Sequence, residues 1–247
     1  GIPEARIQPK GVPPAVRNSD ECLGAIALTA RPNAKSMLVI GFGGGVTVAH
    51  APDAIESIDV IEIEAEVVKA NRLVAKLRDR DPLSDPRVRV IINDARGALS
   101  LTSKRYDIIC SQPSHPWTAG ASHLFTTEFF EQVRAHLNPG GVFVQWMHIG
   151  MIDEPLFKTL GRTILDSFED VRLYNPASEL ILFLASDRPL EPELQVAQTR
   201  EPLKSDPVRY SRLAINCAED LCLMLVLERW GLEELCRGAP RNTDDMN

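Results

Sequence analysis

The sequence has no apolar run that approaches the length of a membrane span, and it has no recognisable signal peptide. Its five cysteines, an odd number, are scattered without a Cys-x-x-Cys pair, which favours reduced thiols in a cytosol-like compartment. Positive charge is also scarce, because 27 Lys and Arg stand against 34 Asp and Glu and leave a net charge of −7. These absences predict a cytoplasmic protein with no membrane contact in this segment, and they argue against a general nucleic-acid binder.

The composition is that of an ordinary globular protein, with 44% hydrophobic and 25% charged residues in a chain of 247. This is enough for one sizeable α/β domain and an appendage. Residues 1–20 are rich in Pro, Gly and charge, so we expect an irregular lead-in or the remnant of a preceding domain. The opening Gly1-Ile2-Pro3 and the uncapped end at residues 242–247 indicate a segment of a longer protein, which can carry other domains or a membrane anchor.

An unbroken apolar run, Met37 to Ile40, leads directly into a glycine cluster. Such a run is typical of a strand buried on both faces of a parallel sheet. Glycines after it let the backbone turn sharply and approach a ligand closely. A second run, Ile58 to Glu62, ends in a carboxylate, and this layout is that of a nucleoside site in which the acid accepts hydrogen bonds from ribose hydroxyls. A tight turn without a ligand and a solvated strand-end charge at Glu62 are the alternatives.

The glycine spacing distinguishes between classes of nucleotide site. Gly41, Gly43 and Gly45 form G-x-G-x-G, the pattern of S-adenosylmethionine-type folds. Val46 stands where the dinucleotide fingerprint G-x-G-x-x-G requires glycine, and no lysine follows at Walker A spacing. The spacing therefore favours a nucleoside derived from S-adenosylmethionine over NAD or a nucleoside triphosphate.

Apolar runs and helical spacings alternate along residues 21–186, which we predict to be a Rossmann-like, nucleoside-binding domain. The predicted strands are 36–40, 57–62, 88–92, 106–111, 142–146, 171–174 and 180–185. They predict an α/β fold with a doubly wound, mostly parallel seven-strand sheet of the S-adenosylmethionine-dependent methyltransferase type, whose last two strands pair antiparallel. Prolines interrupt the pattern after residue 186, and Ala218–Trp230 has helical spacing, so residues 187–247 are expected to form a helical C-terminal segment.

Ligands of open α/β sheets bind at the carboxyl ends of the strands. Asn93 and Asp94 follow the third predicted strand, where Asp94 can accept a hydrogen bond from an adenine amino group. Asp94 is equally placed to cap a helix over residues 95–101, and the two roles are compatible. Residues 111–116 and 145–148 lie at the ends of the fourth and fifth strands, where the chemistry is expected.

Several motifs follow one another in order: GFGGG, VIEIE, NDA, SQPSHPWTAGASHLFT and NPGGVFVQW. Together they resemble the spermidine synthase (polyamine aminopropyltransferase) family, in particular its bacterial spermidine synthase-like branch. Members of that family bind decarboxylated S-adenosylmethionine and pass its aminopropyl group to a diamine. The resemblance implies that the three glycines line the methionine-like tail, that Glu62 holds the ribose, and that Asn93 and Asp94 meet the adenine.

The amine half departs from the family pattern at three positions. Gly44 and Gln112 stand where the family has aspartates, the second of which deprotonates the attacking amine, and His115 replaces an aspartate that holds the diamine. An amide cannot act as a general base at neutral pH, and losing a positioned base typically costs about 10²–10⁴ in rate. Three functions stay open: an aminopropyltransferase-like enzyme, a methyltransferase that uses S-adenosylmethionine on another acceptor, and a nucleoside-binding domain without catalysis. The expected partners are a small-molecule substrate, a polyamine in the first case, and a second copy in a homodimer.

Histidines near these strand ends offer a replacement base. A neutral imidazole can accept a proton near neutral pH, so Gln112 and His115 are the candidate catalytic positions. His123 and His148 are expected nearby as hydrogen-bonding groups. The three histidines lack metal-ligand spacing, and no metal site is predicted.

The loop after the fourth strand contains further candidates. Trp117 and Phe125, together with Trp146 of the fifth strand, are expected to wall the substrate pocket, with core packing as the alternative for Trp146. Residues 118–122 are small and flexible, as a lid over the site requires.

Overall fold

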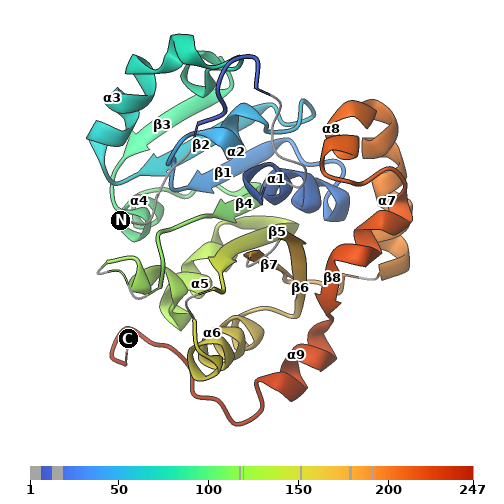
Figure 1. Ribbon diagram of the computed structural model, residues 1–247. Coiled ribbons are helices and arrows are strands. Elements are labelled where there is room, and N and C mark those ends of the chain that lie inside the picture. The colour runs from blue at the N-terminus through green and yellow to red at the C-terminus, as the bar shows by residue number, and fades with distance from the viewer. Residues whose placement is uncertain are drawn as a thin grey trace.

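The computed structural model describes residues 7–12, 19–116, 118, 120–150, 152–177, 180–190 and 192–246. They form one eight-stranded sheet, in the order β3-β2-β1-β4-β5-β7-β6-β8, with helices on both faces (Figure 1). The predicted doubly wound α/β fold is confirmed, and the sheet has one strand more than predicted. Within the described ranges, no helix is both long and apolar enough to cross a membrane.

Five strands run parallel: β1 (Ser36–Ile40), β2 (Ser57–Glu62), β3 (Val88–Ile92), β4 (Tyr106–Ser111) and β5 (Leu137–His148). β1 pairs with β2 on one side and with β4 on the other, so the glycine cluster emerges near the middle of the sheet. β5 begins before the predicted residue 142, because the pairing of β4 with β5 shifts register between Tyr106 and Ile108 and continues to Leu137. Long-range pairing, and not the local sequence, sets that boundary.

Two antiparallel strands complete the predicted set. β6 (Asp170–Ala177) pairs with β7 (Leu180–Ser186), and β7 lies between β6 and β5. The predicted antiparallel pair is confirmed. Because β7 pairs antiparallel with β5, the carboxyl end of β5 at His148 lies beside the start of β7 at Leu180.

The segment Ala218–Trp230 is not the single helix predicted. It divides into the 3₁₀ helix η4 (Ala218–Met224), the strand β8 (Leu225–Leu227) and the first residues of α9 (Arg229–Leu235). β8 pairs antiparallel with β6, with Leu227 opposite Leu173. Pairing with the sheet edge satisfies backbone groups that a helix would satisfy internally, so tertiary structure overrides the helical spacing of the leucines.

Helices and 3₁₀ turns connect the strands. They are α1 (Ser19–Ala30), α2 (Val46–Ala49), α3 (Ala65–Leu73), η1 (Ala75–Leu77), η2 (Pro82–Ser84), α4 (Ala95–Ser100), η3 (Ser122–Phe125), α5 (Thr127–Ala135), α6 (Glu154–Ser167), α7 (Pro192–Ser205) and α8 (Pro207–Arg212). α3 ends at Leu73, and η1 follows directly after Val74. The hydroxyl of Thr126 caps α5 by accepting a hydrogen bond from Phe129 N at 3.4 Å.

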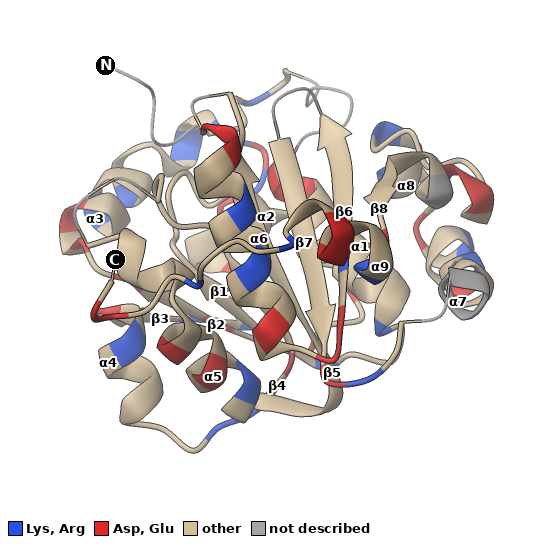
Figure 2. Cartoon of the chain, turned by 90° about the horizontal axis from the view of Figure 1, so that it is seen from below, with Lys and Arg blue, Asp and Glu red and all other residues tan. Residues whose placement is uncertain are grey.

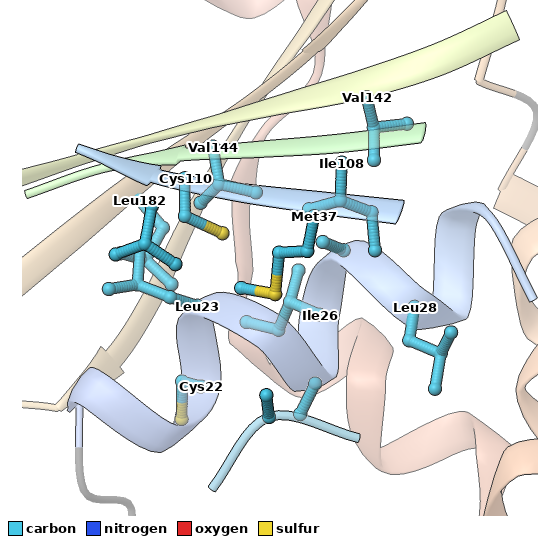
Figure 3. Close-up of a cluster of buried hydrophobic side chains, with 14 of the residues drawn as sticks. Cys22, Leu23, Ile26, Leu28, Met37, Ile108, Cys110, Val142, Val144 and Leu182 are labelled. Atoms are coloured by element: carbon cyan, nitrogen blue, oxygen red, sulfur yellow. The ribbon is translucent and has the colours of Figure 1, made fainter. Parts of the chain in front are cut away.

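Alternate residues of the buried strands face opposite layers of the core. Met37 points to one layer, where it meets Leu23 and Ile26 of α1 together with Ile108 and Val144 of the neighbouring strands (Figure 3). All five side chains are fully buried or within 1% of it. This layer holds α1 against the sheet, as the unbroken apolar runs predict for a strand covered on both faces.

The second layer lies on the opposite face, where Leu38 and Ile40 of β1 belong to one hydrophobic cluster with residues of α4, α5, α6 and α9. The C-terminal residues reach both layers, because α7 packs on α1 while α9 packs on α6. The second contact is close: a Cβ atom added at Gly161 of α6 would lie 2.6 Å from Cys236 Sγ. In Figure 1 the chain accordingly runs from α7 and α8 past β8 to α9.

One buried carboxylate joins three strands at their amino-terminal halves. Asp59 of β2 is 3% exposed and accepts two hydrogen bonds from the Arg89 guanidinium of β3, at 3.0 and 2.9 Å. It also accepts from Lys104 Nζ at 2.9 Å and from the Tyr106 hydroxyl of β4 at 2.7 Å. Burial raises the pKa of Asp59, but these hydrogen bonds together outweigh burial and lower it.

Charged residues of both signs are interspersed over the elements seen in Figure 2. The four cysteines whose side chains are described, Cys22, Cys110, Cys217 and Cys236, are free thiols, in line with the predicted reduced state.

Candidate functional site

The carboxyl ends of the parallel strands bring the predicted site residues to one edge of the sheet. Ile40 lies beside Ser111, and Ser111 lies beside Gln145. On the other side of β1, Glu62 pairs with Ile92, and Asn93 N donates to Glu62 O at 3.1 Å. The glycine loop therefore lies between one half of the site at β2 and β3, called the nucleoside half after the sequence prediction, and a second half at β4 and β5.

The glycine loop, residues 41–45, has three glycines in the left-handed region, with φ of +88° at Gly41, +51° at Gly43 and +73° at Gly45. At Gly41 a Cβ atom would lie 2.8 Å from Gln112 O, a backbone atom at the end of β4. Both the φ angle and this contact exclude larger residues. The sharp turn predicted for these glycines is present, and the close approach of the loop to a ligand stays a prediction.

Side chains from three other segments hold the loop carbonyls. Gln112 Nε2 donates to Gly41 O at 2.8 Å, Asn71 Nδ2 donates to Gly43 O at 2.8 Å, and Arg78 donates to Gly44 O at 3.0 Å. Arg78 also donates to Asn71 Oδ1 at 2.8 Å, which links the second and third of these contacts. Sequence inspection missed Asn71 and Arg78, because no local pattern signals a side chain that reaches back to a loop about 30 residues earlier.

Glu62 is not the solvated strand-end charge of the alternative interpretation, since only 7% of it is exposed. Its Oε2 accepts from Phe42 N of the glycine loop at 2.9 Å, and its Oε1 accepts from Glu64 N at 2.9 Å. A carboxylate oxygen can accept more than one hydrogen bond, so both oxygens keep capacity for a ligand hydroxyl. Glu62 thus fixes the loop and can also accept from a ribose.

Asp94 caps α4, because its Oδ1 accepts from Gly97 N at 2.8 Å. Asn93 Oδ1 accepts from Asp94 N at 2.8 Å, which fixes the turn. Sequence inspection overlooked two apolar neighbours: Ile63 and Ile92 are 63% and 48% exposed where β2 and β3 end. Exposed isoleucines beside polar acceptors offer an apolar surface on which a flat base can lie.

Gln112 is engaged at both ends of its amide. Besides the bond from Nε2 to Gly41 O, its Oε1 accepts from Thr47 Oγ1 of α2 at 2.6 Å. The side chain therefore joins the end of β4 to the glycine loop and to α2.

The predicted histidine cluster is present in part. His115 is 7% exposed, its ring lies edge-on to that of His148 at 5.8 Å, and it lies 6.2 Å from the Trp146 ring. His123 lies 3.9 Å from Asp244 of the C-terminal residues and is half exposed. Among the described residues, no group of three His, Cys, Asp or Glu side chains is arranged to hold a metal ion.

The prediction that Phe125 helps to wall the substrate pocket is wrong. Phe125 is 2% exposed and belongs to the core layer with Phe129 and Phe130. It packs inward because η3 turns directly into α5. Trp146 is half-buried and packs against the first core layer, and Trp117 lies outside the described residues, as does part of the predicted lid.

Two buried polar atoms occur on β4 and β5, the strands that form this second half. Ser111 Oγ and Gln145 Oε1, on neighbouring strands and at most 1% exposed, have no hydrogen-bond partner within the described residues. Buried polar atoms without a partner mark places where a ligand or ordered water completes the bonding. The sequence predicts no role for either side chain, because period-two burial in a strand does not distinguish a core position from a strand-end contact.

Known proteins resemble this chain over the residues that form this edge of the sheet. The family model "Spermine/spermidine synthase domain" covers residues 18–176. Polyamine aminopropyltransferases of Escherichia fergusonii and Klebsiella pneumoniae (strain 342) are 31% and 32% identical over 159 residues, which is 64% of this chain and 55% of each relative. The chain thus spans about half the length of these curated relatives.

Solved structures agree at the level of the fold. Spermidine synthase from Thermotoga maritima has a TM-score of 0.68 at 21% identity, covering 89% of this chain and 74% of its own. A spermidine synthase in complex with the transition-state analogue AdoDATO has a TM-score of 0.63 at 23% identity, covering 81% and 76%. Human methyltransferase-like protein 13 in complex with SAH has a TM-score of 0.62 at 16% identity, covering 79% and 92%. The family model matches residues 18–176, which is more than half of this chain, and the chain therefore belongs to the spermine/spermidine synthase family.

Proposed function

We propose that the chain binds decarboxylated S-adenosylmethionine, or a close thioether nucleoside, and transfers its aminopropyl group to a small-molecule acceptor. The single observation that carries this proposal is Glu62, a buried carboxylate fixed against the glycine loop beside two exposed isoleucines. The polyamine aminopropyltransferase relatives supply the reaction class. A cytoplasmic location and a homodimer stay predictions.

The nucleoside half has a group suited to each part of such a ligand. Glu62 accepts from the ribose hydroxyls, Asp94 and Asn93 meet the adenine amino edge, and Ile63 and Ile92 contact its ring. The left-handed glycines bring the loop backbone close to the methionine-like tail. When bound, the sulfonium group of the nucleoside supplies the electrophilic carbon of the transfer.

The second half lacks the carboxylates that a cationic amine favours. The amide of Gln112 is hydrogen-bonded to Gly41 O and to Thr47 Oγ1, and an amide takes no proton at neutral pH. Ser111 Oγ and Gln145 Oε1 offer neutral partners to an acceptor, and His115, with His148 beside it, is the candidate base. We therefore infer slow or absent turnover of putrescine and spermidine.

The same neutral half favours one second candidate, a methyltransferase that uses S-adenosylmethionine on another acceptor. The fold is shared with a methyltransferase-like protein solved with SAH. A thermal-shift panel of decarboxylated S-adenosylmethionine, S-adenosylmethionine, methylthioadenosine and NAD separates the candidates. Selective stabilisation by the decarboxylated form supports the first and selective stabilisation by S-adenosylmethionine the second, whereas NAD binding without thioether nucleoside binding contradicts both.

Glu62→Ala is expected to weaken methylthioadenosine binding by about 1.5–3 kcal/mol, which is roughly 10- to 100-fold, because a carboxylate acceptor of ribose hydroxyls is lost. Isothermal titration calorimetry measures the change. Glu64→Ala is the matched control, since Glu64 is exposed two residues away, and it should bind as the natural chain does. Equal dissociation constants for the natural chain and Glu62→Ala would show that Glu62 does not hold the nucleoside.

Gln112→Asp is expected to raise polyamine formation from decarboxylated S-adenosylmethionine at least about 10-fold, because it restores a base and a charge that faces an ammonium group. Adding His115→Asp should raise it further, mainly through substrate affinity. Gln112→Asn is the matched control, because it shortens the side chain and loses the Gly41 contact in the same way without adding charge. Fast turnover by the natural chain would instead assign the proton transfer to another group, with His115 tested next.

A further inference from the structure

We propose that a cavity behind the glycine loop binds a phosphate-sized anion, either inorganic phosphate or the phosphate group of a small metabolite. The cavity lies between α2, residues 78–80 and α8, and it has a volume of about 100 Å³. That is several times the roughly 10–15 Å³ that one water molecule needs. Its lining consists of Gln8, Val46, Ala49, His50, Arg78, Asp79, Arg80 and Arg212.

Positive charge predominates in this lining. Three guanidinium groups, those of Arg78, Arg80 and Arg212, face one lining carboxylate, Asp79, whose Oδ2 already accepts from Gly11 N at 3.0 Å. A second carboxylate, Glu21, lies behind the lining and pairs with Arg212 at 3.4 Å. Within the lining, guanidinium groups therefore outnumber carboxylates three to one, with Glu21 and Asp81 acting on them from outside it. Planar guanidinium groups match tetrahedral oxyanions through paired hydrogen bonds.

His50 adds no charge to this balance at neutral pH. Burial lowers its pKa, and Arg212 and Arg80 lower it further, while Glu21 raises it. The imidazole lies 3.5 Å from Glu21 and accepts or donates according to its tautomer. Because His50 is neutral, the positive charge that would bind an anion comes from the arginines.

Two of the arginines have unused buried donors. Arg78 is 7% exposed, and the Nε atoms of Arg78 and Arg212 have no hydrogen-bond partner within the described residues. Burial of the Arg78 guanidinium lowers its pKa, an effect that Asp81 only partly offsets. Arg78 is thus a buried cation of the cavity lining whose guanidinium is not fully hydrogen-bonded, and an anion can complete such bonding.

The cavity is connected to the glycine loop through Arg78 of its lining. Arg78 donates to Gly44 O and to Asn71 Oδ1, and Asn71 donates to Gly43 O. An anion that fixes Arg78 therefore also fixes the loop carbonyls, so anion and nucleoside should each tighten the binding of the other by the same factor. This coupling, unlike anion binding itself, depends on the nucleoside site proposed above.

The test titrates the full chain with inorganic phosphate, ribose 5-phosphate and ribose by isothermal titration calorimetry. Phosphate is expected to bind, and Arg80→Ala is expected to raise its dissociation constant at least about 10-fold, because a charge-assisted contact is lost. Arg80 is exposed, so this variant should fold. Arg72→Ala is the matched control, because Arg72 is an exposed arginine of α3 outside the lining, and it should leave phosphate binding unchanged.

The comparison of ligands identifies the source of the anion. Tighter binding of ribose 5-phosphate than of phosphate, with no binding of ribose, assigns the site to a phosphorylated metabolite, whereas equal binding assigns it to inorganic phosphate. Absence of phosphate binding at millimolar concentration, or an equal loss in Arg72→Ala and Arg80→Ala, overturns the proposal. Phosphate binding is measured without the nucleoside, so its outcome is independent of whether methylthioadenosine binds.

Discussion

Gly41→Ala is expected to weaken methylthioadenosine binding more than about 100-fold, the largest effect of any single substitution at the site. The φ of +88° at this position costs an alanine roughly 1–2 kcal/mol. In addition, the new methyl group would lie 2.8 Å from Gln112 O. Gln112 directly follows the central strand β4 and its N–H donates to Ile40 O, so this backbone atom cannot move away cheaply. The loop must shift instead, and the bond between Phe42 N and Glu62 shifts with it.

Calorimetry measures the binding, and a thermal melt measures how much of the loss comes through the fold. Gly238→Ala is the matched control, because Gly238 has a φ of +75° but no heavy atom within 4 Å of the added Cβ. It carries the backbone cost alone and should bind the nucleoside normally. A folded Gly41→Ala protein with an unchanged dissociation constant would contradict a nucleoside site at this loop.

Asp59→Ala is expected to lower the free energy of unfolding by about 2–3 kcal/mol. The Tyr106 hydroxyl, on a residue 2% exposed, would lose its acceptor. Arg89 and Lys104 lose less, because their side chains are 65% and 37% exposed and remain solvated. Urea unfolding at neutral pH measures the change.

The stability that Asp59 contributes depends on pH. Hydrogen bonds hold the pKa of folded Asp59 below its ordinary value of 3.8 against the effect of burial. The stability it contributes is therefore complete above that value and is lost as the pH falls through the folded pKa. The difference between the natural chain and Asp59→Ala should shrink in acid. The double variant Asp59→Ala/Tyr106→Phe should be no less stable than Asp59→Ala, since it removes the orphaned hydroxyl; a further loss of about 1 kcal/mol would show that the hydroxyl is stabilised elsewhere.

The four strands β1 to β4 could be predicted to the residue, because each is a short apolar run bounded by polar or glycine residues. Local sequence does not contain the pairing that extends β5 back to Leu137 or that recruits Leu225–Leu227 to the sheet edge. Leucines at helical spacing in Ala218–Trp230 favour a helix on their own. The open edge of β6 changed that outcome, and only the folded sheet provides it.

The location of the site followed from strand ends alone, while its contacts did not. Glu62, Asp94 and Gln112 lie at one edge because parallel strands end together. The bonds that make Gln112 part of the glycine loop, and Arg78 its support, join residues distant in sequence. Their roles toward ligands stay predictions. Phe125 was misplaced because an aromatic residue after a loop has the same pattern whether it faces a pocket or the core.

The path of residues 187–246 has a consequence for how the protein is made. The parallel strands leave the ribosome early. The outer surface of α1 is covered only when α7 has been made, and that of α6 only when α9 has been made. A nascent chain that already contains the glycine loop and the ends of β1 to β5 therefore still presents apolar surface on both layers of its sheet. Such surface is prone to aggregation during synthesis, so slow translation before α7 would lengthen the period in which the chain depends on chaperones.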